Sequence, residues 1–226
     1  MRIGVDLDGT VADLQSALAR EANRLFPGID PASLPASADS GEGSPEAAEE
    51  PKLSMPALTL RQQDRLWKEV RARKNFWESL EELEPGALAR LSRLMAERRW
   101  EIIFLTSRPE TAGETAQAQS HRWLSEHGFS MPSVFVVHGS RGRIAASLRL
   151  DVVVDDRPEN CLDVAVESSA RAFLVWPGHE SELPPGAVRH GVKQVPTISA
   201  ALDALLELDR ARSGGVGRSI RRLFGR

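Results

Sequence analysis

The sequence is poor in cysteine and in long hydrophobic runs. Its 226 residues include one cysteine, Cys161, which excludes an intrachain disulfide and a cysteine-based zinc site. No stretch approaches the roughly 18 consecutive apolar residues that a membrane-spanning helix needs. Residues 1–3 lead directly into a strand-like run, so we expect no signal peptide, and the single cysteine agrees with a cytoplasmic location.

The C-terminal segment lacks acidic residues. The whole chain has a formal net charge of −3, and residues 210–226 contribute six arginines and no acid, so the remainder carries −9. Such a segment could bind anionic lipid or nucleic acid as a short amphipathic helix. We favour a solvated terminus and expect no stable nucleic-acid complex, because a short isolated segment is marginal as a helix.

Five short apolar runs predict a parallel sheet. They are rich in Val, Ile and Phe and lack the polar alternation of a sheet with one face in water; they lie at residues 3–7, 102–105, 134–137, 152–154 and 173–176. Helical patterns lie between and after them, at residues 86–99, 111–127, 144–148, 163–169 and 198–209. The alternation predicts an α/β fold with a doubly wound, Rossmann-like parallel sheet.

One region interrupts this alternation. Residues 14–85 contain no convincing strand and two helical stretches, at 15–25 and 60–73, which predicts a helical insertion after the first strand. Within it, residues 36–51 are small, acidic and nearly free of large apolar side chains, so we expect a mobile or disordered segment there. Three aromatic residues near its end could stack on a base, but we favour a role in packing the insertion; they are Trp67, Phe76 and Trp77.

Two aspartates follow the first apolar run directly, in Asp6-Leu-Asp8-Gly9-Thr10. At this spacing one carboxylate can attack phosphorus while the other transfers a proton. Two neighbouring negative charges repel each other and a phosphate, so the pair favours a divalent cation, and oxygen ligands beside a phosphate favour Mg2+. The alternative is an Asp-rich turn whose side chains only cap backbone N–H groups.

Two later apolar runs also end in polar residues. Thr106 and Ser107 follow the second run; hydroxyls beside free backbone N–H groups bind phosphate oxygens, although the same residues commonly begin a helix. Asp155 and Asp156 follow the fourth run, where paired carboxylates are costly unless a cation neutralises them. For this second pair we favour metal binding over a solvated turn.

In this order, each behind an apolar run, these segments resemble the motifs of the haloacid dehalogenase superfamily of phosphohydrolases. The resemblance implies that Asp6 is the nucleophile, that Asp8 is the general acid and base, and that Thr106 binds phosphate. It also implies that Asp155 and Asp156 hold Mg2+, together with Asp6 and the backbone carbonyl of Asp8. The presence of a second aspartate argues against the dehalogenase branch, whose members lack the acid at that position.

The lysine that steadies the phosphate in this superfamily is missing from its expected place. Between the second and last motifs lies a basic turn, Ser140-Arg141-Gly142-Arg143, and counting back 14 residues from Asp155 gives Arg141. Arg143 is the neighbouring candidate. An arginine keeps the positive charge that would offset the nucleophile and the phosphoryl group, but it is not interchangeable with a compact ammonium. A merely solvated loop remains the alternative for both arginines.

Further short segments resemble 5'(3')-deoxyribonucleotidases and the bacterial nucleotidases related to them. The segments are Phe76-Trp77-Glu-Ser-Leu80, Thr106-Ser107-Arg108-Pro109 and Trp123-Leu124-Ser-Glu-His127-Gly128. The resemblance implies a phosphatase core at residues 1–13 and 86–209 and a helical cap at 14–85, and the charge composition marks 210–226 as a basic tail.

The implied function is Mg2+-dependent hydrolysis of a phosphomonoester through an aspartyl-phosphate. A small phosphorylated metabolite is the expected partner, and a nucleoside monophosphate is the leading candidate. The alternatives are a phosphatase acting on sugar or other small phosphate esters, and a catalytically weak binding protein that keeps the fold.

Overall fold

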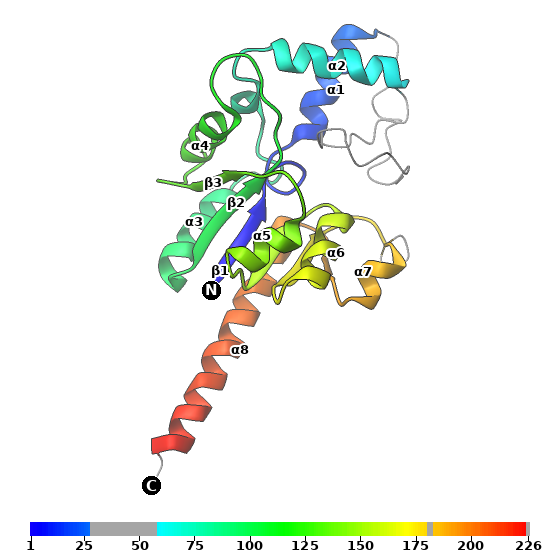
Figure 1. The fold of residues 1–226 in the computed structure, drawn as a ribbon. Coiled ribbons are helices and arrows are strands. Elements are labelled where there is room, and N and C mark those ends of the chain that lie inside the picture. The colour runs from blue at the N-terminus through cyan, green and yellow to red at the C-terminus, as the bar shows by residue number, and fades with distance from the viewer. Residues whose placement is uncertain (28–57, 180–182, 225–226) are drawn as a thin grey trace. The chain divides into compact units, whose positions relative to one another are not determined.

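A computed structural model describes residues 1–27, 58–179 and 183–224, with side chains described as far as Arg212. Its strands form a six-stranded sheet in the order β3-β2-β1-β4-β5-β6 (Figure 1). The strands are β1 (Arg2–Asp6), β2 (Glu101–Thr106), β3 (Ser133–Val136), β4 (Val152–Asp155), β5 (Arg171–Val175) and β6 (Lys193–Val195). The helices are α1 (Leu14–Leu25), α2 (Leu60–Ala72), the 3-10 helix η2 (Phe76–Ser79), α3 (Ala87–Arg98), α4 (Ala116–Glu126), α5 (Arg141–Ser147), α6 (Pro158–Glu167), α7 (Pro185–Arg189) and α8 (Ile198–Phe224).

This order is that of a doubly wound α/β sheet, in which the strand sequence reverses between β1 and β4. The predicted fold class is therefore confirmed. The chain divides into two compact units by its contacts. Unit 1 consists of Met1–Gly4, Arg90–Glu101 and Arg141–Arg226, and unit 2 consists of Val5–Ala89 and Ile102–Ser140.

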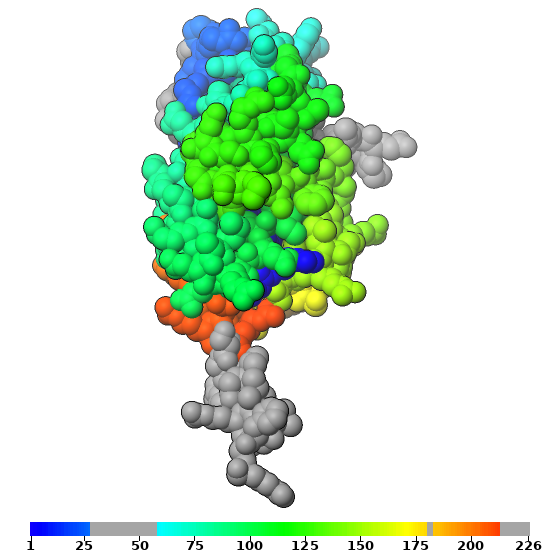
Figure 2. Space-filling model, turned by 90° about the vertical axis from the view of Figure 1, so that its left-hand side faces the viewer, coloured from blue at the N-terminus to red at the C-terminus, as the bar shows by residue number. Residues whose placement is uncertain are grey.

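Unit 2 contains the described part of the insertion, with β2, β3 and α4. β2 pairs with β3 in parallel, and its Phe104 packs edge to face on Phe129, with ring centroids 5.0 Å apart. The exposed side of α4 lies on the face drawn in Figure 2. The three aromatic residues near the end of the insertion are buried, which confirms their predicted packing role; they are Trp67, Phe76 and Trp77.

Three helices of unit 2, α1, α2 and α4, begin at side chains that accept hydrogen bonds from their free N–H groups. Asp13 accepts from the Ser16 N–H at the start of α1, and Thr115 accepts from the Ala118 N–H at the start of α4. α2 begins with a reciprocal capping box. Caps of this kind each stabilise a helix by about 1 kcal/mol. They fix the first turn of α4, which contributes residues to the site described below.

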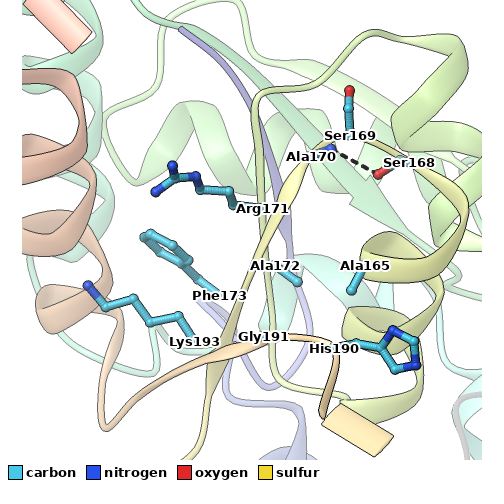
Figure 3. Close-up of a pocket in the computed structure, with 10 residues that line it drawn as sticks. All are labelled: Ala165, Ser168, Ser169, Ala170, Arg171, Ala172, Phe173, His190, Gly191 and Lys193. Carbon is cyan, nitrogen blue, oxygen red and sulfur yellow. Dashed lines mark hydrogen bonds between the residues drawn. The ribbon is translucent and has the colours of Figure 1, made fainter. Parts of the chain in front are cut away.

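In unit 1, β5 is covered on both sides. β4, β5 and β6 pair in parallel, α6 packs on β4 and β5, and α8 packs on β5 and β6. Figure 3 shows Arg171 and Phe173 pointing to one side of β5, and Ala172 pointing to the other side, toward Ala165 of α6. This two-sided burial explains why the strand reads as an unbroken apolar run.

The structure differs from the predicted elements at several places. It adds β6 and the short helices η2 and α7. It starts α4, α5 and α6 at residues 116, 141 and 158 rather than at 111, 144 and 163, and it continues α8 to Phe224 instead of ending it at Asp209. The predicted low-complexity segment at 36–51 lies outside the described residues. Among the helices of the described residues, none is long and apolar enough to span a membrane.

Candidate active site

Asp6 is the last residue of β1, and its side chain is buried. Directly after it the chain turns back on itself: the Gly9 N–H donates to the Ala12 carbonyl, and the Ala12 N–H donates to the Leu7 carbonyl. Gly9 has a φ of 87°, a conformation that costs a side-chain-bearing residue energy. The turn places Asp8 just beyond the strand end, where doubly wound sheets bind their ligands.

Asp8 is held by an arginine that the sequence did not single out. Arg108 Nε donates to the two carboxylate oxygens of Asp8 at 3.0 and 2.9 Å, and Arg108 Nη2 donates to Asp8 Oδ1 at 2.7 Å. The Thr106 hydroxyl donates to Asp8 Oδ2 at 3.3 Å. The structure thus brings together two residues predicted from sequence, Asp8 and Thr106, and adds a third.

Arg108 is fully buried and contacted on every side. Its Cζ lies 4.9 Å from the ring centroid of Trp77 and 5.8 Å from that of Trp123. Its Nη1 donates to the Ser120 hydroxyl at 2.8 Å. A buried guanidinium needs such partners, because an uncompensated buried charge is strongly destabilising.

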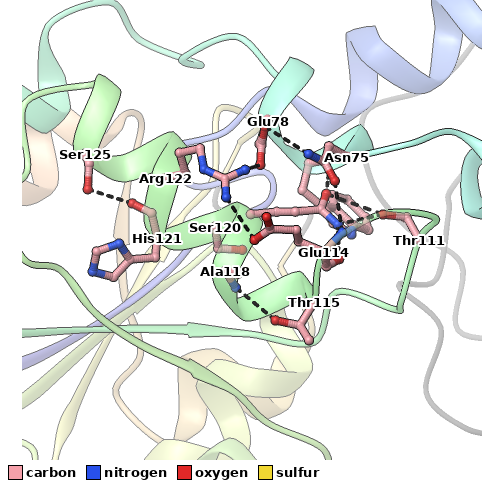
Figure 4. A network of polar contacts seen from close by, with 12 residues as sticks. Asn75, Glu78, Thr111, Glu114, Thr115, Ala118, Ser120, His121, Arg122 and Ser125 are labelled. Carbon is pink, nitrogen blue, oxygen red and sulfur yellow. Dashed lines mark hydrogen bonds and ion pairs between the residues drawn. The ribbon is translucent and has the colours of Figure 1, made fainter.

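The residues around Arg108 are fixed by a polar network between η2 and α4 (Figure 4). The buried Gln119 accepts the Trp77 backbone N–H at 3.1 Å and donates to the Thr111 hydroxyl at 2.9 Å. Arg122 forms ion pairs with Glu78 and Glu114. The network holds the end of the insertion against the helix that follows the second motif.

In unit 1, Asp155 ends β4 and is fully buried. Its Oδ1 accepts the Arg157 N–H at 2.9 Å, and both oxygens accept from Asn160 Nδ2 at 3.0 Å. Burial raises the pKa of the Asp155 carboxyl, and the charge of Arg141 offsets part of that rise. A carboxylate so deprived of water is suited to a cation.

The structure distinguishes the two arginines of the basic turn. Arg141 is buried at the first position of α5, with its Nε 3.5 Å from Asp155 Oδ2. The Arg143 side chain is 82% exposed and pairs with Glu167 at 3.5 Å. Only Arg141 therefore faces a predicted motif residue of unit 1.

Gly142 lies between these arginines at a close approach of two helices. A Cβ on Gly142 would lie 2.1 Å from the Asp163 carbonyl oxygen and 2.7 Å from the Glu167 Cβ, both in α6. Neither atom belongs to a flexible side-chain end that could move away. The first turn of α5 can therefore approach α6 this closely only with glycine at this position.

The remaining predicted site residues, Ser107 and Asp156, are half-buried. Within the described residues, no group of three or more His, Cys, Asp or Glu side chains is arranged to hold a metal. Mg2+ does not require such a group, since it keeps several waters and is commonly held by one or two carboxylates with the substrate phosphate. The buried Asp155 fits that donor set.

A hollow of about 500 Å³ in unit 1 is not part of this site (Figure 3). It is lined by Arg171 and Lys193, the first residues of β5 and β6. Arg171 pairs with Val152, whereas Asp155 is at the other end of β4 and pairs with Leu174. The hollow therefore lies at the opposite end of these strands from the carboxylate.

A model of the family described as "5' nucleotidase, deoxy (Pyrimidine), cytosolic type C protein" (NT5C) matches residues 1–169, about three quarters of the chain. The chain belongs to the NT5C family. Its matched region runs from β1 through α6 and includes every predicted site residue.

Solved structures share the fold of this NT5C protein. A hydrolase from Pseudomonas syringae has a TM-score of 0.53 and 17% identity, with 92% of this chain and 99% of that chain covered. A HAD family hydrolase from Deinococcus radiodurans, with bound phosphate and sodium, has a TM-score of 0.55 and 14% identity, with 92% and 95% covered. No curated protein matches. Family and fold together identify an enzyme of the phosphatase and nucleotidase type, within the superfamily that the sequence motifs indicated.

Proposed function

We propose that this NT5C protein is a Mg2+-dependent 5'-nucleotidase that hydrolyses nucleoside monophosphates through an aspartyl-phosphate. The observation that carries the proposal is the strand order β2-β1-β4, whose last residues are Thr106, Asp6 and Asp155. Neighbouring parallel strands end at the same edge of a sheet, and the reversal of strand order at that edge is where doubly wound folds bind ligands. The family description supports nucleotides as the substrate class.

In the first step, an Asp6 carboxylate oxygen attacks phosphorus and the bond from phosphorus to the ester oxygen breaks. Asp8 gives its proton to the departing oxygen, which leaves as the nucleoside hydroxyl. In the second step, Asp8 takes a proton from water as the water attacks the aspartyl-phosphate. Inorganic phosphate departs, Asp6 is regenerated as a carboxylate, and Asp8 regains its proton.

Other residues bind and neutralise the phosphoryl group. The hydroxyls of Thr106 and Ser107 would donate to its oxygens. Arg141 is buried beside Asp155 and would take the role of the missing lysine, whereas Arg143 faces water. Mg2+ would neutralise charge on the nucleophile and the transferred phosphoryl group. Its protein ligands would be Asp6, the backbone carbonyl of Asp8, Asp155 and Asp156.

The test is the Asp6→Asn variant, assayed for phosphate release with saturating Mg2+. We expect complete loss of turnover with an unchanged circular dichroism spectrum, because the amide has the shape of the carboxylate but is not a nucleophile. Unchanged turnover of p-nitrophenyl phosphate by the variant would remove Asp6 as the nucleophile.

A panel of phosphomonoesters tests the substrate class on the wild-type protein. We expect nucleoside monophosphates to have the highest kcat/KM. A preference for sugar phosphates would indicate the metabolite phosphatase instead, and failure to hydrolyse any member would indicate a binding protein that retains the fold.

A further inference from the structure

A proton-transferring carboxyl group must point in one fixed direction. Asp8 follows a strand end and lies on a turn, so its backbone alone leaves the side-chain rotamers open. Three contacts from a single arginine occupy both of its oxygens, and the longest of them is 3.0 Å. The fork of Arg108 therefore fixes the plane of the Asp8 carboxyl as well as its position.

The arginine is itself held by contacts to several residues. Its Nε and Nη2 face Asp8 and its Nη1 faces Ser120, whose hydroxyl in turn donates to the Ala116 carbonyl at 2.7 Å. The Trp77 and Trp123 rings flank the guanidinium. A lysine would keep the charge but could neither form the fork nor stack as a plane.

One of these contacts comes from the insertion that follows the first strand. Trp77 belongs to η2, its Nε1 donates to the Pro109 carbonyl at 3.0 Å, and its backbone N–H donates to Gln119. The residue next to Arg108 and the helix that carries Ser120 are thus both bonded to Trp77. The end of the insertion and the second motif form one rigid support for the guanidinium.

From these contacts we infer that Arg108 is a positioning residue for Asp8, braced by Trp77 of the insertion. The inference rests on the proposed function, in which Asp8 gives a proton to the leaving oxygen. Arg108 acts through Asp8, by fixing the orientation of its carboxyl group. Neither the family match nor the motif resemblance assigns a role to Arg108.

The dependence of rate on the leaving group tests this role. An aryl phosphate such as p-nitrophenyl phosphate needs little protonation of its leaving oxygen, whereas an alkyl phosphate needs a proton from the acid. In Arg108→Lys we expect kcat/KM for a nucleoside monophosphate to fall about 10-fold more than kcat/KM for p-nitrophenyl phosphate, since misplacing a proton donor costs part of the roughly 100- to 10,000-fold that acid catalysis supplies. Across aryl phosphates, the slope of log kcat/KM against leaving-group basicity should steepen.

Two further variants make the result specific. Asp8→Asn should steepen the same plot, and adding Arg108→Lys to it should steepen it no further, because the positioned group is already absent. Arg122→Lys is the matched control: Arg122 belongs to the same network but pairs with Glu78 and Glu114. We expect it to change the rates for all substrates by one common factor.

Trp77→Phe tests the brace and replaces Arg108→Lys if that variant does not fold. The substitution keeps the contacts of Arg108 with Asp8 and removes the indole ring. We therefore expect a smaller steepening of the plot of log kcat/KM against leaving-group basicity. Equal losses for alkyl and aryl substrates in both variants would overturn the inference, and so would a gain in turnover, which would mean that the pair holds Asp8 away from the substrate. A wild-type protein without turnover would overturn the proposed function and this inference with it.

Discussion

Two carboxylates at strand ends, Asp8 and Asp155, each face a buried arginine, but the two pairs are built differently. Arg108 donates three hydrogen bonds of 2.7 to 3.0 Å to the Asp8 carboxylate. Arg141 Nε lies 3.5 Å from Asp155 Oδ2, and the Arg157 N–H and Asn160 Nδ2 donate to the same carboxylate. The forked contact of Arg108 fixes the orientation of the Asp8 carboxylate, whereas the longer contact of Arg141 supplies positive charge beside a carboxylate that already accepts N–H donors. An arginine can therefore either orient a carboxylate or supply positive charge beside it.

The largest expected effect tests Asp155 as a metal ligand. In Asp155→Asn, we expect phosphate release to fall roughly 100-fold or more, because the metal supplies several kcal/mol of charge stabilisation. The rise in Tm that Mg2+ gives the wild type by binding the folded state should also disappear. Thermal unfolding with and without Mg2+ measures this, and Asp203→Asn, at an exposed carboxylate paired with Arg90, should keep the rise. A Mg2+ shift retained in Asp155→Asn would contradict a metal-binding role for this residue.

The next effect tests Arg141 as the charge partner of Asp155. Arg141→Met leaves the buried carboxylate without its cation, which costs about 3–5 kcal/mol of unfolding free energy. Urea unfolding at pH 7 measures the loss, and Arg141→Lys should lose less. Burial already raises the pKa of Asp155, so the deficit should shrink at pH 5, where the carboxyl protonates more readily. A deficit that is the same at both pH values would show that Arg141 stabilises by packing alone.

A third carboxylate extends the comparison to the surface. Asp151 accepts from the Arg2 N–H at 2.8 Å and from Arg212 Nη1 at 2.6 Å. Burial acts to raise the pKa of Asp151, but these two donors outweigh it and hold the pKa below its ordinary value of 3.8. The lowered pKa of Asp151 adds to the stability of the fold above pH 3.8. This added stability is lost as the pH falls through the lowered pKa. Because solvent screens the pair, Asp151→Asn should cost at most about 1 kcal/mol at pH 7.

The difference between Asp151→Asn and wild type should shrink as the pH falls from 7 toward about 2, because protonation through the lowered pKa removes the charge of the Asp151 carboxyl. Urea titrations at the two pH values measure it. A deficit that persists in acid would assign the contribution of Asp151 to hydrogen bonding rather than to charge.

The smallest effect concerns Arg143. Its exposed side chain pairs with Glu167 only at the surface, so Arg143→Met should change the unfolding free energy by no more than about 0.5 kcal/mol. It should also leave phosphate release unchanged. A large loss of activity in this variant would show that Arg143, rather than Arg141, takes the role of the missing lysine.

The sequence predicted the parts of the fold that are buried on both sides. The five apolar runs are strands, but β6 was missed because Lys-Gln-Val contains one apolar residue and lies at the sheet edge. The helix α7 was missed because five residues after Pro184 carry no periodic signal. Edge strands and single helical turns depend on tertiary contacts more than on local sequence.

The order of polar residues behind the strands predicted Asp8 and Thr106, which the structure brings together, but it did not indicate the arginine that packs beside them. Arg108 stands between a serine and a proline in a loop, and nothing local indicates that two indoles will enclose it. The choice between Arg141 and Arg143 was open because α5 was predicted to begin after both. In a helix, residues two apart point in nearly opposite directions, so the true start of α5 would have allowed only one to be buried.

Gly142, which lies between those two arginines, determines how closely α5 packs on α6. Arg141 is carried on α5, and α5 can lie where it does only because Gly142 lets its backbone touch that of α6. The spacing of two helices thus determines how far a positive charge stands from a buried carboxylate. A methyl group added at residue 142 would push α5 away from α6. An assay would record this displacement as a defect in catalysis, although no reacting atom had been changed.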